Sequence, residues 1–272
     1  ERVLVFAPHP DDEALGCAGV LRRALNTGDE VRVVVATCGD AYRGAKLAFE
    51  ESFPSESYDR DGDNDFDMLD YGILRSSETL AAMAAVGLEP SDVVFLGYPD
   101  AGLDDLWRSN EVYLSGFTGV SEVPKSYDFA YNVGASYQRD SILADIKNQI
   151  LEFGPTLIYS PTDTDHHQDH WGLAKFVNQA LIELAHVRTW KSHFGYLIHW
   201  EANEEGWPTS STQWTVPRGH APPDLWVTLS DFEYSREEKS NVIDLYESQV
   251  FVGRAYLVGF AKDAEIFWLE SW

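Results

Sequence analysis

Apolar runs that alternate with helical patterns constrain the fold of this chain most. Four runs are β-prone and short enough to be strands covered on both faces: 3–6, 31–37, 93–96 and 156–159. Three stretches carry apolar residues at helical spacing and are closed by glycine: 14–25, 76–86 and 139–153. This alternation predicts an α/β fold with a mainly parallel sheet, flanked by helices on both faces.

The second half of the chain continues the pattern. We expect a helix over 171–185, strands over 194–199 and 225–229, and a last long helix that is capped by Ser230 or Ser235 and runs through Tyr246. No Ser/Pro/Gly-rich linker divides the 272 residues. We therefore expect a single Rossmann-like domain over 1–272.

Two long segments interrupt the alternation. Residues 41–72 form an acidic insertion, and residues 101–136 form a loop rich in Tyr, Phe and Ser. Each follows a predicted parallel strand, so both insertions should gather above the carboxyl edge of the sheet. Ligands of α/β sheets usually bind at that edge.

The composition limits the partners. Forty-five acidic residues against twenty basic ones give a formal charge of -25, which repels nucleic acid and anionic lipid surfaces. No segment approaches the roughly 20 apolar residues of a membrane span. We expect a soluble protein with a small-molecule or glycoconjugate substrate; the sequence does not indicate an oligomeric state.

The N-terminal sequence and the cysteines bear on the compartment. No signal peptide is recognised, so the cytoplasm is the default expectation, although the acidic composition also suits export and Glu1 directly before the first strand leaves a trimmed leader open. Cys17 and Cys38 are too few for a disulfide framework. We expect two thiols, with one bridge as the alternative.

Two polar turns, 6–13 and 160–170, hold histidines and carboxylates directly after predicted strands. In a parallel sheet both turns open onto the same edge. His9 and Asp12 lie three residues apart on the first turn, and His170 lies at the end of the second. Two imidazoles and a carboxylate with a position open for water are a typical catalytic zinc set, which would lower the pKa of water from ~15.7 toward ~7.

Neighbouring polar residues are candidates for the proton transfers of amide hydrolysis. Asp11 is free to act as general base, and His167 could stabilise the tetrahedral oxyanion or protonate the leaving amine. Asp169 is expected to orient a histidine through its second ring nitrogen. The other histidines lack partners at ligand spacing, so we expect core or surface roles for His186, His193, His199 and His220.

The acidic insertion contains a calcium-type pattern. Carboxylates occupy positions one, three, five, seven, nine and twelve of such a loop: Asp59, Asp61, Asp63, Asp65, Asp67 and Asp70. The match is imperfect, because Asn64 stands where glycine is normally required and Asp70 replaces the longer glutamate. A structural Ca²⁺ site and a solvated acidic loop are the two hypotheses.

The two polar turns carry a family resemblance. Pro8-His9-Pro10-Asp11-Asp12-Glu13 and His167-Gln168-Asp169-His170 resemble the signatures of the zinc-dependent N-acetylglucosaminyl deacetylases of the PIG-L or LmbE-like type. The resemblance implies zinc ligation by His9, Asp12 and His170. It also implies Asp11 as general base and His167 as transition-state stabiliser.

Further segments extend the resemblance over most of the chain. Arg75 followed by Glu78, and the segment 95–100, are similar to family segments whose Arg and Asp contact sugar hydroxyls, which implies substrate contacts for Arg75 and Asp100. The alternatives are an ion pair with Glu78 and a turn cap. Residues 239–249 resemble a late family helix, but Tyr246 stands where many members have histidine.

The function expected from these residues is a zinc-dependent hydrolase that removes an N-acetyl group from an N-acetylglucosamine-containing glycoconjugate, with Asp11 as general base. Fe(II) or Co(II) could take the same ligands. Two alternatives stay open. One is an amidase acting on a non-sugar N-acyl substrate, and the other is a non-catalytic, calcium-dependent carbohydrate-binding protein.

Overall fold

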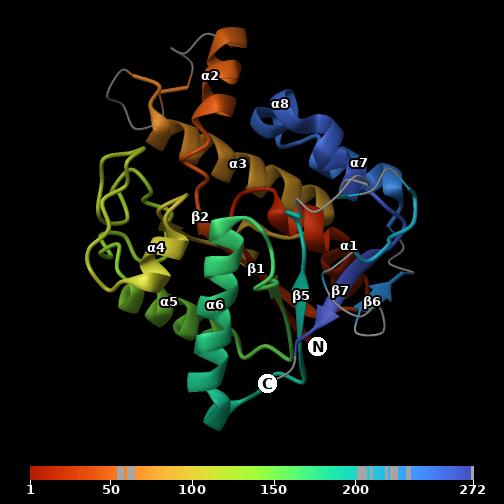
Figure 1. The fold of residues 1–272 in the computed structure, drawn as a ribbon. Helices are drawn as coiled ribbons and strands as arrows, with labels where there is room; N and C mark the ends of the chain where they lie inside the picture. The colour runs from red at the N-terminus through yellow and green to blue at the C-terminus, as the bar shows by residue number, and fades with distance from the viewer. Residues whose placement is uncertain are drawn as a thin grey trace.

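A seven-stranded sheet forms the centre of the computed structural model, which describes residues 1–53, 58–59, 65–200, 207–208, 211–217, 220, 226–230 and 234–270. The strand order is β3-β2-β1-β4-β5-β7-β6 (Figure 1). The strands are β1 (Arg2–Ala7), β2 (Glu30–Thr37), β3 (Val93–Tyr98), β4 (Leu157–Pro161), β5 (Ser192–Tyr196), β6 (Trp226–Leu229) and β7 (Glu265–Leu269).

The first five strands are parallel, and β7 and β6 continue the sheet in antiparallel pairing. The central strand β1 pairs with both β2 and β4, so the segments after β1 and β4 meet at one edge of the sheet. This arrangement confirms the predicted α/β fold and the predicted convergence of the two polar turns. The strand β7 was not predicted.

Helices cover both faces of the sheet (Figure 1). The α-helices are α1 (Asp12–Asn26), α2 (Arg43–Ser52), α3 (Met68–Val86), α4 (Leu103–Arg108), α5 (Arg139–Phe153), α6 (Gln168–Glu183), α7 (Arg236–Ile243) and α8 (Glu247–Leu257). Short 3₁₀ turns are η2 (Pro90–Asp92), η3 (Ala185–Val187) and η5 (Val258–Phe260).

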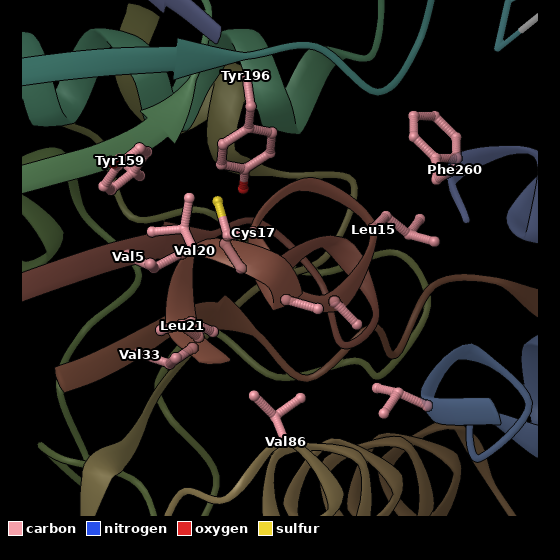
Figure 2. Close-up of a cluster of buried hydrophobic side chains, with 14 of the residues drawn as sticks. Val5, Leu15, Cys17, Val20, Leu21, Val33, Val86, Tyr159, Tyr196 and Phe260 are labelled. Carbon is pink, nitrogen blue, oxygen red and sulfur yellow. The ribbon is translucent and has the colours of Figure 1, made fainter. Parts of the chain in front are cut away.

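Two apolar cores lie on opposite faces of the sheet. Alternate residues of a strand point to opposite faces, so Val5 packs with α1, α3 and α7 while Phe6 packs with α4, α5 and α6. Figure 2 shows the first core, in which Leu21 and Val33 lie close together. Cys17 belongs to this core and Cys38 to the other, and both are free thiols. The prediction of two free thiols is confirmed, and the alternative of a disulfide between Cys17 and Cys38 is wrong.

Local capping explains where the helices differ from the predictions. Helix α3 begins eight residues before the predicted Ser76, because the Asp67 side chain accepts from the backbone N–H of Leu69 at 2.6 Å and of Asp70 at 3.1 Å. Ser235, rather than Ser230, caps α7. The last helix is not continuous: α7 ends at Ile243, and α8 begins after Tyr246.

Candidate metal centre and its cavity

The turn after β1 is held in an uncommon backbone conformation. Asp11 precedes α1 with φ of 121°, a value that non-glycine residues seldom adopt and that costs on the order of 1–3 kcal/mol. Its backbone N–H donates to Glu13 Oε2 at 3.2 Å, and its carbonyl accepts from the N–H groups of Ala14 and Leu15. These bonds hold the turn so that His9, Asp11 and Asp12 all border one cavity.

The structure brings His9, Asp12 and His170 together around one oxygen. Asp12 Oδ2 lies 3.1 Å from His9 Nδ1 and 3.1 Å from His170 Nε2. All three residues are buried, with exposed fractions of 8%, 1% and 0% for His9, Asp12 and His170. Neither ring nitrogen of His170 makes a well-aligned hydrogen bond, although Nε2 lies 3.1 Å from Asp12 Oδ2 and Nδ1 lies 3.2 Å from Asp165 Oδ2. The approach of Nε2 to the same oxygen as His9 Nδ1 suits ligands directed at a shared cation.

Carboxylates hold the opposite ring nitrogens. His9 Nε2 lies 3.1 Å from Asp169 Oδ2 and 3.2 Å from Asp100 Oδ1, and His170 Nδ1 lies 3.2 Å from Asp165 Oδ2. Asp169 also accepts from the backbone N–H groups of Ala101 and Leu103 at the start of α4, and its role in orienting a histidine stays a prediction. A carboxylate behind each imidazole is typical of histidines that bind metal.

Ligand atoms within 4.8 Å of one another form three overlapping groups among the described residues. The groups are His9, His167 and His170; Asp12, His170 and His199; and His9, Asp100 and Asp169. The donor set of imidazoles and several carboxylates fits a divalent cation better than a neutral ligand. Burial lowers the pKa of His9, but the carboxylates led by Asp100 outweigh it and raise this pKa well above its usual value.

The carboxyl group of Asp11 has an environment suited to proton transfer. Burial and the charge of Asp12 raise its pKa to about 8, and the guanidinium of Arg75, 3.5 Å away, opposes this rise. A cation held by Asp12 would act in the same direction as Arg75. Asp11 borders the cavity beside the three converging groups, where it can reach a water molecule.

Arg75 and Asp100 border the cavity, but much of their bonding capacity is already used. Arg75 donates to the carbonyls of Gly39 at 3.0 Å and Pro10 at 2.7 Å. Gly39 has φ of +70°, and a Cβ there would lie 2.0 Å from the Arg75 guanidinium. The alternative ion pair with Glu78 is not formed, since Glu78 accepts from the backbone N–H and hydroxyl of Ser248. Substrate contact by either residue stays a prediction.

Asp100 joins the first polar turn to the acidic insertion. Its Oδ2 accepts from the backbone N–H of Ala41 at 2.8 Å, and its Oδ1 faces His9 Nε2. Its pKa is held well below the usual value, because attraction to the imidazole of His9 outweighs the effect of burial. Asp100 therefore stays ionised and fixes the orientation of the His9 ring.

His167 lies at the start of α6 with its ring over the metal-ligand candidates. Its Nδ1 accepts from the backbone N–H of Asp169 at 3.3 Å, and its ring centroid lies 4.9 Å from that of His9. Burial and the neighbouring imidazoles of His9 and His170 lower its pKa to about 3. His167 borders the cavity, and its role in catalysis stays a prediction.

His199 belongs to this cluster, and the expectation of a core or surface role is wrong for it. Its ring centroid lies 4.7 Å from that of His170 and 5.0 Å from that of His167. Its Nδ1 lies 3.3 Å from the Tyr256 hydroxyl, and its backbone N–H donates to Asp165. The signal was available, since His199 follows β5, the parallel neighbour of β4.

The remaining histidines lie away from the converging groups. His193 is buried in β5 with its Nε2 2.7 Å from the hydroxyl of Ser160. His186 is exposed in η3, the short turn after α6, and His220 lies beside Trp200 and Trp226. The expected core and surface roles hold for these three.

A cavity of about 400 Å³ opens above the converging groups. Its floor is polar, and helix α8 with its neighbours supplies a largely apolar wall. The lining residues are His9, Asp11, Asp12, Leu15, Ala41, Tyr42, Arg75, Asp100, Ala101, His167, Ile198, His199, Gln249, Val252, Gly253, Tyr256 and Leu257. The late helix therefore contributes to the cavity although Tyr246 replaces the expected histidine.

The described residues of the calcium-type segment do not line the cavity. Asp61 and Asp63 are outside the described residues, and Asp59 and Asp65 lie in the adjoining described positions. Asp67 and Asp70 form the capping box of α3, and Asp70 is fully buried. Helix capping explains the carboxylates at these two positions, and the calcium hypothesis for the segment stays a prediction.

Comparison with known proteins identifies a family and several relatives. A family model described as PIG-L, GlcNAc-PI de-N-acetylase, matches residues 4–181. The 1D-myo-inositol 2-acetamido-2-deoxy-alpha-D-glucopyranoside deacetylases of two Mycobacterium strains, KMS and JLS, are each 28% identical over 171 residues, which is 62% of this chain. The matched segment spans 46% of the length of those relatives.

Solved structures share the fold over nearly the whole chain. The deacetylase of the antimicrobial reagent A40926 pseudoaglycone superposes with a TM-score of 0.58 at 19% identity, covering 98% of this chain and 96% of that one. The zinc-inhibited form of teicoplanin deacetylase gives 0.56 at 17% identity, covering 99% and 97%. Within the described residues, no helix is both long and apolar enough to cross a bilayer.

Proposed function

The chain belongs to the PIG-L family of GlcNAc-PI de-N-acetylases, and from this membership we propose that it is a zinc-dependent hydrolase that removes the N-acetyl group from an N-acetylglucosamine-containing glycoconjugate. The observation that carries the proposal is the approach of His9 Nδ1 and His170 Nε2 to the same oxygen of Asp12. The two histidines come from turns after different parallel strands. Such a set is suited to a single metal ion and a water molecule.

His9, Asp12 and His170 would hold the ion. When bound there, Zn²⁺ would lower the pKa of a water molecule and polarise the acyl carbonyl. A divalent cation is supported by the donor set, and the structurally similar teicoplanin deacetylase is described in a zinc-inhibited form. The carboxylates of Asp100, Asp169 and Asp165 keep the two imidazoles in the orientation that ligation requires.

Asp11 transfers a proton from the attacking water to the leaving amine. It takes a proton from the attacking water as the water oxygen bonds to the acetyl carbon. His167, across the cavity, faces the carbonyl oxygen that becomes negative, and its hydrogen-bonded Nδ1 leaves Nε2 as the nitrogen able to donate to that oxygen. The C–N bond then breaks, Asp11 returns the proton to the amine, and acetate leaves.

The proposal is tested by measuring metal content and acetate release together. The purified protein is assayed with a panel of N-acetylglucosamine conjugates and non-sugar N-acyl amides, before and after chelation. We expect about one zinc per chain and acetate release from the sugar conjugates, with both lost on chelation. Turnover of non-sugar amides alone would overturn the sugar assignment and favour an amidase.

The same panel addresses a carbohydrate-binding protein without catalysis. Such a protein would bind sugars with an affinity that does not depend on Asp11 and would release no acetate. Acetate release that requires Asp11 excludes it.

A further inference from the structure

His199 lies close to two of the proposed metal ligands, Asp12 and His170. One ligand atom from each of these three residues lies within 4.8 Å of the other two. The ring centroids of His199 and His170 are 4.7 Å apart, with the ring planes at 82°. Asp12 and His170 lie at the starts of α1 and α6, whereas His199 follows β5. Segments after three adjacent parallel strands, β1, β4 and β5, therefore meet at this point.

The hydrogen bonds of Tyr256 determine which nitrogen of His199 can bind a cation. The Tyr256 hydroxyl donates its single hydrogen to the carbonyl of Ile198 at 2.7 Å. The same hydroxyl lies 3.3 Å from His199 Nδ1, so Nδ1 is the donor in this pair. A neutral imidazole carries one N–H hydrogen, and Nε2 therefore keeps an unshared electron pair. His199 thus offers Nε2 as a ligand nitrogen.

Asp165 holds the backbone of His199 against the second polar turn. Its Oδ2 accepts from the backbone N–H groups of Ile198 at 2.9 Å and His199 at 3.0 Å, and the same oxygen lies 3.2 Å from His170 Nδ1. The backbone N–H of His166 donates in return to the carbonyl of His199 at 3.0 Å. Asp165 is 4% exposed. One buried carboxylate therefore contacts both histidines and sets the spacing between them.

We propose that His199 is a fourth protein ligand of the metal, binding through Nε2 beside His9, Asp12 and His170. This inference rests on the proposed function, which assigns a metal to these residues, and it adds a ligand from outside the two polar turns. Three imidazoles and a carboxylate favour Zn²⁺ or Co²⁺ over Mg²⁺ and Ca²⁺, which prefer oxygen ligands. Zinc can take five ligands at a catalytic site, so four protein ligands leave a position for water.

The first test counts the bound histidines in the Co²⁺-loaded protein by proton NMR. An imidazole that binds through one nitrogen carries an exchangeable hydrogen on the other, and the paramagnetic ion shifts the resonance of that hydrogen strongly. We expect three such resonances in the parent and two in His199→Phe, a substitution that keeps a ring to stack on Tyr256. Two resonances in the parent would overturn the proposal, whether or not the variant folds.

The second test measures Zn²⁺ affinity by competition with a chromophoric chelator. We expect His199→Phe to weaken binding on the order of 10²-fold, and Tyr256→Phe, which removes the bond to Nδ1, to weaken it about tenfold. His186→Phe is the control, because His186 is exposed in η3 and its loss should leave the affinity unchanged. Parental affinity in His199→Phe would overturn the proposal.

These measurements separate the fourth ligand from the proposed function. Acetate release by a parent that shows two shifted resonances would overturn the ligand role of His199 alone. Three shifted resonances and weaker Zn²⁺ binding in His199→Phe, in a parent that releases no acetate from any conjugate, would overturn the proposed function alone.

Discussion

The hydroxyl of Tyr246 donates to Glu13 Oε1 at 2.6 Å and so connects the break between α7 and α8 to the first turn of α1, 233 residues earlier in the chain. The other oxygen of Glu13 accepts from the backbone N–H of Asp11. Tyr246 is therefore linked to the proposed general base, Asp11, through two hydrogen bonds that meet at Glu13. Tyr246 stands where a histidine was expected, and its hydroxyl stabilises the turn that holds Asp11.

Replacing Tyr246 with phenylalanine should weaken both stability and catalysis. Tyr246→Phe removes one hydrogen bond from a fully buried carboxyl group, which should cost about 1–3 kcal/mol in the free energy of unfolding. The kcat for acetate release should fall because the uncommon backbone conformation of Asp11 loses support. Urea denaturation and the acetate assay measure the two effects.

Tyr234→Phe is the matched control for this variant. The Tyr234 hydroxyl is buried without a hydrogen-bond partner among the described residues, so its removal should change the free energy of unfolding by much less. Equal losses in the two variants would contradict the role given to the bond between Tyr246 and Glu13.

Asp11 and Asp12 are adjacent, but substituting them should have different effects on metal content and on kcat. Asp11→Asn should retain the metal and lose about 10²-fold or more in kcat, because it removes a general base. Asp12→Ala should lose the metal itself, since Asp12 carries the oxygen approached by both imidazoles. Elemental analysis beside the acetate assay separates the two outcomes, and parental activity in Asp11→Asn would refute the mechanism.

The sequence predicted those strands and turns that are determined by the hydrophobic pattern of neighbouring residues. The segments that form β1 to β4 are continuously apolar, which is why they could be recognised as strands. The meeting of the polar turns after β1 and β4 follows from the parallel pairing of these two strands. The antiparallel strand β7 was missed because its Glu265 is buried by pairing with Lys239, a contact distant in sequence. His199 was missed because the predicted strand ran to residue 199, whereas β5 ends at Tyr196 and leaves His199 in the segment after it. Asp165 was missed because the backbone of that segment, from which it accepts, comes beside it only when β4 and β5 pair.

Removal of the metal should lower stability as well as activity. Without a cation, the carboxylates of Asp11, Asp12 and Asp100 lie buried close to one another, and Arg75 is the guanidinium that faces them. A metal that binds only the folded protein stabilises it by mass action, by about 2.7 kcal/mol at one hundred times Kd. Chelation should therefore lower the Tm, and added Zn²⁺ should restore it. An unchanged Tm with full loss of zinc would contradict a buried metal site.

Glu78 should make the protein less stable as the pH rises through neutrality. Burial raises its pKa to about 7 although hydrogen bonds from Ser248 oppose this, so the folded protein holds a proton that the unfolded chain, with a pKa near 4.5, has released. The stabilisation is complete below about pH 4.5 and is lost as the pH rises through about 7, a change of up to about 3 kcal/mol. Glu78→Gln should flatten this dependence in urea denaturation at pH 5 to 8, whereas Glu111→Gln at an exposed position should keep the parental slope. A parental slope in Glu78→Gln would show that another group carries the effect.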